Sequence, residues 1–167
     1  MYSKNCIYDY VQLNISADNY ESDNIVLNFQ IPQGAYYDIK RGPVCSVALV
    51  QASTTASSAV AGPGLKNYSV RWLNPAFNTY SSNQEGLNVG NLVHFKSVAN
   101  DEEYYRLNPT EASEVMTTPK PNNIRLVIVD EDNTRVKHEN GYFIFRFTYY
   151  DQQIVDMNLR NEQYRLL

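Results

Sequence analysis

The chain has 167 residues, a net charge of −4 and a sequence pI of about 5.1, and it contains no run of Lys or Arg. Direct binding to nucleic acid is therefore not expected, because affinity for phosphate requires clustered cations. Charged residues make up 19% of the sequence, below the roughly 25% of typical domains. Such a polar, weakly charged surface suits a protein that packs among neighbours, and it also suits an extracellular β-domain.

A chain of this length forms one domain whose core needs no disulfide or metal. Cys6 and Cys45 are far apart and form no CxxC motif, so we expect free thiols. The first residues, MYSKNCIYDYVQL, lack the apolar segment of a secretory signal. No run approaches the roughly 18 apolar residues that span a membrane. We expect a protein made in a cytosol, without a membrane span.

Apolar and polar residues alternate in the first third of the chain, which predicts half-buried strands. In IYDYVQLNI (7–15), the residues that share one face are Ile7, Val11, Leu13 and Ile15. In DNIVLNFQI (23–31), they are Ile25, Leu27, Phe29 and Ile31. PVCSVALVQAS (43–53) is apolar on both faces, as expected of a central strand, and its turn signal is Gly42–Pro43.

Further strands are predicted in NYSVRWLN (67–74), NLVHFKSV (91–98), YYRL (104–107) and NNIRLVIVD (122–130). Helical signals are weak, and we expect a single helical turn in NPTEASEVM (108–116), where Thr110 is a candidate N-cap. The long loops 53–67 and 74–90 consist largely of small residues or Asn.

The last predicted strand, GYFIFRFTYY (141–150), has two apolar faces. We expect its core face to hold Phe143, Phe145, Phe147 and Tyr149. The opposite face, too apolar for open solvent, holds Tyr142, Ile144, Arg146, Thr148 and Tyr150. We expect this opposite face to pack on another sheet or subunit. Because an unpaired charge is costly on such a strand, we expect Arg146 to pair with a carboxylate such as Asp130 or Glu139, or with a neighbouring subunit.

About eight strands with turn-rich connections predict an all-β fold, namely a single eight-stranded jelly-roll β-sandwich with long loops and a C-terminal arm. Residues 1–153 would form the jelly-roll domain and residues 154–167 the arm. The arm holds apolar residues among polar ones, so we expect it to dock on its own domain or on an adjacent subunit. Its candidate contact residues are Ile154, Met157, Leu159 and Tyr164. Periodicity does not decide whether the arm is a helix or a strand.

No motif in the sequence predicts catalysis, a cofactor or a metal site. The two histidines, His94 and His138, lie in no zinc-binding spacing. The acidic run 130–132 lacks the spacing of a calcium loop and predicts a turn in which Asp and Asn bond their own backbone. We therefore expect no enzyme activity, no cofactor and no metal. Trp72, Phe77 and Tyr80 are either a platform for stacking sugars or part of an aromatic core.

The C-terminal third reads PNNIRLVIVDEDNTRV followed by NGYFIFRFTYYD, which is a strand, an acidic turn and an aromatic strand. This pattern resembles the closing hairpin of small capsid jelly rolls in the double-jelly-roll lineage of DNA viruses. That lineage includes large nucleocytoplasmic DNA viruses, virophages and polinton-like viruses. The residues that carry the resemblance are Ile124, Arg125, Asp130, Asp132 and Arg146. FQIPQGAYYDIKRGPVCSVALVQAS extends the resemblance, while Asn133 and Thr134 replace the glycine that this family places after the turn.

The resemblance implies a structural virion protein made in the host cytoplasm, either a capsid penton subunit at the fivefold vertex or a minor capsid protein. Its implied partners are further copies of itself, as a pentamer, together with a major capsid protein and other capsid proteins. The candidate interface residues are Tyr142, Ile144, Arg146, Tyr150, Ile154, Met157, Leu159 and Tyr164. The competing hypothesis is a carbohydrate- or receptor-binding β-sandwich, such as a spike or fibre head or a lectin-like module.

Overall fold

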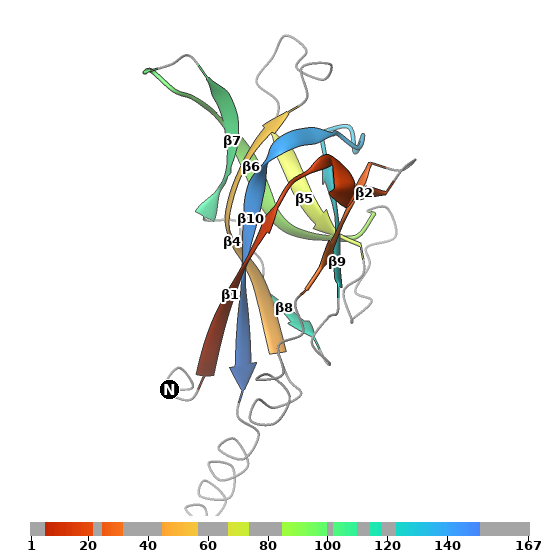
Figure 1. The fold of residues 1–167 in the computed structure, drawn as a ribbon, viewed down its shortest axis with the longest axis vertical. Coiled ribbons are helices and arrows are strands. Elements are labelled where there is room, and N and C mark those ends of the chain that lie inside the picture. The colour runs from red at the N-terminus through yellow and green to blue at the C-terminus, as the bar shows by residue number, and fades with distance from the viewer. Residues whose placement is uncertain are drawn as a thin grey trace, which may run out of the picture.

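The computed structural model describes residues 6–21, 25–31, 45–56, 67–73, 85–99, 102–109, 114–117 and 123–150 (Figure 1). Within these ranges the chain forms ten strands and one short 3₁₀ helix, η2 (Ala17–Asn19). The strands are β1 (Cys6–Asn14), β2 (Tyr20–Glu21), β3 (Val26–Gln30), β4 (Cys45–Ala56), β5 (Tyr68–Trp72), β6 (Leu87–Lys96), β7 (Glu103–Leu107), β8 (Glu114–Thr117), β9 (Asn123–Val129) and β10 (His138–Tyr150).

Eight of these strands pair as nested antiparallel hairpins, which is the connectivity of a jelly roll. β1 pairs with β10, β3 with β9, β4 with β8, and β5 with β6. Two further pairings, β10 with β4 and β9 with β5, connect these hairpins side by side, so that the strands form two runs of neighbours. These runs are β1-β10-β4-β8 and β3-β9-β5-β6, and Figure 1 shows β1, β10 and β4 side by side.

The remaining two strands lie outside the nested set. β7 pairs with both β4 and β6, so it joins the two runs along one side of the molecule. β2 is a two-residue strand that pairs only with β3 among the described residues. The all-β prediction is confirmed, while the described strands number ten rather than the predicted eight. No helix in the described part is long and apolar enough to cross a membrane.

The main core lies between the two runs of strands. Phe143, Phe145 and Phe147 are fully buried in it, as predicted for the core face of β10. Phe143 meets Phe29 of the opposite run edge-to-face, with 6.2 Å between the ring centroids. Tyr149, the fourth residue predicted for this face, is the next-to-last residue of β10, and its side chain lies outside the described part.

For most of the predicted strands, the residues assigned to the core face are buried. Leu13, Ile15, Leu27, Phe29 and Ile31 are all buried in the main cluster. The placement of Ile25 in the core is wrong, because this residue is 37% exposed and occupies a turn with φ of 51°. The residue beside it, Val26, is buried on the other face of the same run, in a small cluster with Val127 and Val129.

Two further predictions have different outcomes. The helical turn in 108–116 is wrong over its last residues, because Glu114–Thr117 is strand β8, held by pairing with β4. The turn after β9 is confirmed: the Asp130 carboxylate accepts hydrogen bonds from the backbone N–H groups of Asp132 (3.0 Å) and Thr134 (2.8 Å). The predicted arm, residues 154–167, lies outside the described residues.

Candidate interaction surface

The face of β10 that points away from the core forms one surface with the same face of β1. The register places Tyr8 opposite Thr148, Tyr10 opposite Arg146, Gln12 opposite Ile144, and Asn14 opposite Tyr142. We call this surface the outer face and define it by Tyr8, Tyr10, Tyr142, Ile144 and Arg146. Tyr8 and Tyr10 are 45% and 64% exposed, and the three residues on β10 are half-buried. The outer face is therefore an aromatic and aliphatic surface that is exposed at Tyr8 and Tyr10, whereas Thr148 opposite Tyr8 is buried.

Specific contacts hold side chains of the outer face in place. The Arg146 guanidinium carbon lies 5.7 Å from the centroid of the Tyr8 ring, within the range of a cation–π contact. The Tyr142 hydroxyl accepts a hydrogen bond of 2.8 Å from the Gln51 side-chain amide of β4. Pairing of Arg146 with Asp130, with Glu139 or with another subunit stays a prediction.

The structure brings three of the predicted interface residues, Tyr142, Ile144 and Arg146, onto the outer face. Tyr150 ends β10 opposite Cys6, and nothing is described of its side chain. The other predicted interface residues lie outside the described part: Ile154, Met157, Leu159 and Tyr164.

Sequence reasoning missed the contribution of β1 to this surface. The alternation in IYDYVQLNI already placed Tyr8 and Tyr10 opposite the core residues Val11 and Leu13. Only the pairing of the first strand with the last, however, shows that these tyrosines lie beside Arg146 and Ile144.

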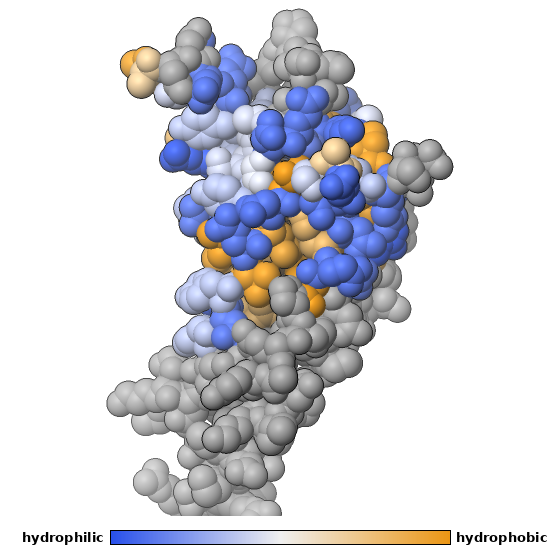
Figure 2. Space-filling view, viewed as in Figure 1, coloured by the Kyte–Doolittle hydropathy of each residue, from blue (hydrophilic) through white to orange (hydrophobic). Residues whose placement is uncertain are grey.

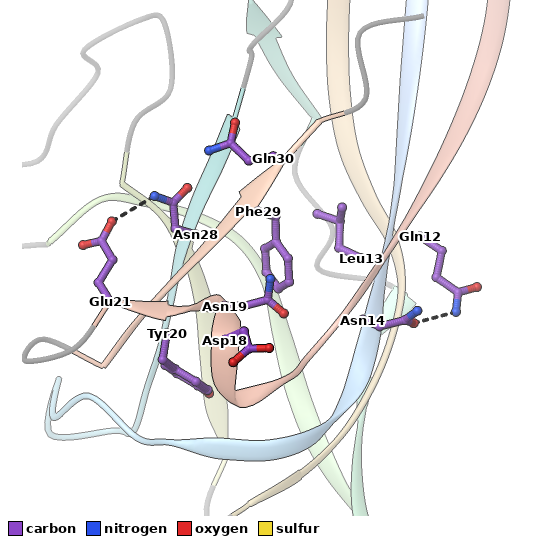
Figure 3. Close-up of a pocket in the computed structure, with 10 residues that line it drawn as sticks. All are labelled: Gln12, Leu13, Asn14, Asp18, Asn19, Tyr20, Glu21, Asn28, Phe29 and Gln30. Atoms are coloured by element: carbon purple, nitrogen blue, oxygen red, sulfur yellow. Dashed lines mark hydrogen bonds between the residues drawn. The ribbon is translucent and has the colours of Figure 1, made fainter.

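A groove opens beside the outer face, between β1 and β3 (Figure 3). It has a volume of about 550 Å³ and a lining of Gln12, Leu13, Asn14, Asp18, Asn19, Tyr20, Glu21, Asn28, Phe29 and Gln30. Leu13 and Phe29 are buried, and Figure 2 shows hydrophobic atoms between β1 and β3, among hydrophilic ones. The groove is thus polar at its rim and apolar at its floor.

An ion pair fixes one wall of this groove. Both side-chain oxygens of Glu21 accept hydrogen bonds from Arg125, at 2.9 Å and 2.7 Å. Arg125 holds the pKa of the Glu21 carboxyl below its usual value, and Glu21 in turn raises the pKa of Arg125. Glu21 also accepts a bond of 3.1 Å from the Asn28 amide. These three contacts occupy much of the hydrogen-bonding capacity of Glu21. The other carboxylate of the groove, Asp18, lies at the rim and is exposed.

The second cluster of chemically active groups surrounds His138 at the start of β10. The Tyr20 hydroxyl donates to the His138 carbonyl (2.7 Å) and accepts from its backbone N–H (3.0 Å). Nδ1 of the imidazole lies 2.7 Å from Oγ1 of Thr54. Burial lowers the pKa of His138 to about 4 and raises the pKa of Tyr20. Since His138 and Thr54 are both fully buried, this pair packs the interior and no substrate reaches it.

The two histidines, distant in sequence, both lie close to the ring of Tyr105. Its ring centroid is 5.4 Å from that of His94 and 5.6 Å from that of His138. Tyr68 adds edge-to-face contacts to Tyr105 (4.7 Å) and His138 (5.1 Å). Among the described residues there is no group of three or more His, Cys, Asp and Glu side chains that would hold a metal ion.

Of the two alternatives for the aromatic residues Trp72, Phe77 and Tyr80, the aromatic core is correct at Trp72, the one member that the structure describes. Its side chain is 0% exposed and belongs to the main core cluster, so it offers no surface to a ligand. Phe77 and Tyr80 lie outside the described residues.

No family model and no curated protein matches the sequence of this chain. The structure defines the class as an all-β protein with jelly-roll pairing of eight of its strands, and any function has to be argued from its surfaces.

Proposed function

We propose that this protein is a structural subunit of a virion, either a capsid penton at the fivefold vertex or a minor capsid protein. In this proposal it assembles in the host cytoplasm with further copies of itself, as a pentamer, and with a major capsid protein and other capsid proteins. The supporting observation is the outer face, where Tyr8 and Tyr10 stand exposed beside half-buried Ile144 and Arg146. The resemblance of the C-terminal hairpin to capsid jelly rolls supports the same assignment.

The composition of the outer face suits contact between proteins. Tyrosine and arginine are enriched at protein interfaces because they combine a large contact area with a polar group. A ring of subunits uses two different, complementary side surfaces, and the outer face would be one of them. The proposal includes no catalytic role, no cofactor and no bound metal.

The test is the oligomeric state of the full chain and of an Ile144→Ser variant, by size-exclusion chromatography with light scattering. We expect the full chain to form a species of about five times its mass of 19.2 kDa, and Ile144→Ser to weaken it about tenfold through loss of apolar burial. Val98→Ser removes a fully exposed apolar residue of the turn after β6 and is the matched control. A full chain that stays monomeric, alone and with a candidate major capsid protein, would falsify the proposal.

The second candidate function is binding of a neutral carbohydrate, and the groove between β1 and β3 favours it. Amide side chains at its rim, such as Asn14, Asn19 and Gln30, offer donors and acceptors for hydroxyl groups, and the buried floor offers apolar contact. Bound sugar would stabilise the folded state by mass action. Melting temperatures of the full chain and of Asn19→Ala with a panel of neutral oligosaccharides test this. If the protein binds carbohydrate, a sugar should raise its melting temperature, and Asn19→Ala should reduce that increase. If no sugar raises the melting temperature, the carbohydrate function is excluded.

A further inference from the structure

Among the described strands, β1 pairs on one side only, with β10, and its other side presents backbone N–H and C=O groups in a regular row. Ile15 N–H donates to the Gly141 carbonyl at 2.8 Å, and the register continues without a shift down to Cys6 opposite Tyr150. In an antiparallel pair every second residue bonds its partner strand, so the alternate residues direct their N–H and C=O groups outward. The outward groups belong to Tyr8, Tyr10 and Gln12, and we call this row the β1 edge.

In the part of the chain that the structure describes, the β1 edge has none of the features that usually block strand addition. Such features are proline, a bulge, an outward charge or a covering element. β1 contains no proline, and its one charged residue, Asp9, directs its backbone toward β10. Among the described strands, β1 ends the sheet, whereas the opposite side of the molecule is closed by β7. The β1 edge is therefore suited to accept an added strand.

The C-terminal segment of the chain begins next to this edge. β10 ends at Tyr150 opposite Cys6, the first residue of β1. Both sides of β10 are occupied, by β1 and by β4, so β10 offers no edge to a further strand. Residues 151–167 reach about 55 Å when extended, and the nine residues of β1 span about 30 Å. The segment is long enough to leave its own domain and cover the β1 edge of another copy.

The sequence of the segment complements the two sides of the β1 edge. Val155, Met157 and Leu159 alternate with polar residues, so in a strand they would share one side. On that side they would meet the exposed rings of Tyr8 and Tyr10, an aromatic–aliphatic pairing that stabilises sheets. The alternate residues 156, 158 and 160, which are Asp, Asn and Arg, would face the polar rim of the groove.

We propose that residues 154–160 of one copy add as an extra strand to the β1 edge of a neighbouring copy. This inference rests on the proposed assembly function and names one of its contacts. The occupant is a segment of this same chain, and the bonds that hold it are main-chain hydrogen bonds to Tyr8, Tyr10 and Gln12.

Two substitutions at one position separate backbone pairing from side-chain contact. Tyr10→Pro removes an outward N–H that β10 does not use, so the domain is expected to fold. Tyr10→Ala removes the same ring but keeps the N–H. We expect Tyr10→Pro to weaken self-association at least about tenfold more than Tyr10→Ala, because a lost pairing costs one or more hydrogen bonds. Equal weakening by the two variants overturns the proposal.

Hydrogen exchange of the full chain gives a readout that does not depend on the proline variant folding. We expect the amides of Tyr8, Tyr10 and Gln12 to be protected in a concentration-dependent way, and a chain lacking residues 154–167 to lose this protection. Protection that is independent of concentration means docking within one copy and overturns the inference. If oligomers persist in both Tyr10→Pro and the truncated chain, this contact is wrong while the assembly function stands. If the full chain never associates, the assembly function itself fails.

Discussion

The two faces of β10 differ in what their apolar residues do. Phe143, Phe145 and Phe147 point inward and are fully buried, so their contribution is to stability. On the outer face, Ile144 and Arg146 are half-buried and lie beside the exposed Tyr8 and Tyr10 of β1. One strand thus carries a closed hydrophobic face and an open amphipathic one.

This difference shows which property of the sequence distinguishes the faces. Both faces of β10 are rich in apolar residues, so hydrophobicity by itself leaves the inward face undecided. The inward face uses Phe, which has no polar atom to satisfy, whereas the outer face carries Tyr142 and Arg146 next to Ile144. The presence of polar atoms therefore separates a core face from a surface that can meet either water or a partner.

The largest expected difference between the two faces comes from removing a large side chain from each. Phe145→Ala should lower the free energy of unfolding by about 4 kcal/mol, because it leaves a cavity in a packed core. Ile144→Ala should lower it by about 1 kcal/mol, since its side chain is already partly in solvent. Chemical denaturation of both variants measures the contrast. Losses of similar size would mean that the outer face is as important for stability as the core.

The second prediction concerns Gly141, where the β10 backbone comes close to β4. Gly141 has φ of 136°, and a Cβ atom there would lie 2.2 Å from the Ser53 carbonyl oxygen. Gly141→Ala should therefore cost about 3 kcal/mol. Gly90→Ala is the control, because its Cβ would meet the movable side chain of Leu107 (2.5 Å), and it should cost about 1 kcal/mol. A neutral Gly141→Ala would show that β10 can move away from β4.

The third prediction is a pH dependence that originates in the buried cluster beneath the start of β10. The pKa of His138 is about 4 in the folded state and about 6.5 in the unfolded chain. Between these pH values the unfolded chain binds a proton that the folded protein does not. The free energy of unfolding should therefore fall by up to about 3 kcal/mol as the pH falls from 6.5 to 4.

His138→Gln separates this contribution from that of the carboxylates, which titrate in both proteins. The difference in unfolding free energy between wild type and His138→Gln should shrink as the pH falls through this range. Denaturant titrations at several pH values measure it. A difference that stays constant with pH would mean that His138 titrates normally, and hence that its site admits water.

Much of the fold could be predicted from period-two alternation. The predicted strands around Leu13 and Phe29 are correct because their apolar residues alternate with polar ones. The strand around Phe145 is correct because its buried face consists of Phe residues. Strand β8 was missed because Glu114–Thr117 contains good helix formers and becomes a strand through pairing with β4. Local propensity does not report such a partner.

The candidate site was less accessible to sequence reasoning. The outer face requires Tyr10 and Arg146, which are opposite each other in space and far apart in the chain. The two alternatives for Trp72 could be separated in the sequence, since the alternation of Tyr68, Val70 and Trp72 predicts a common buried face, and all three are buried. An aromatic residue in phase with a core strand is better assigned to the core than to a ligand site.

The smallest expected effect on stability, and the sharpest test of the outer face, is Arg146→Met. Its guanidinium lies over the Tyr8 ring at a partly exposed site, where a cation–π contact contributes about 0.5–1 kcal/mol. Methionine keeps most of the apolar contact, so the free energy of unfolding should fall by less than about 1 kcal/mol. If Arg146 also meets a neighbouring subunit, assembly should weaken by a larger factor than stability does. Arg146→Lys keeps the charge without the planar guanidinium, so its assembly should be weaker than that of the wild type and stronger than that of Arg146→Met. A variant that folds and assembles like the wild type would remove Arg146 from the interface, and the outer face would then reduce to its tyrosines and Ile144.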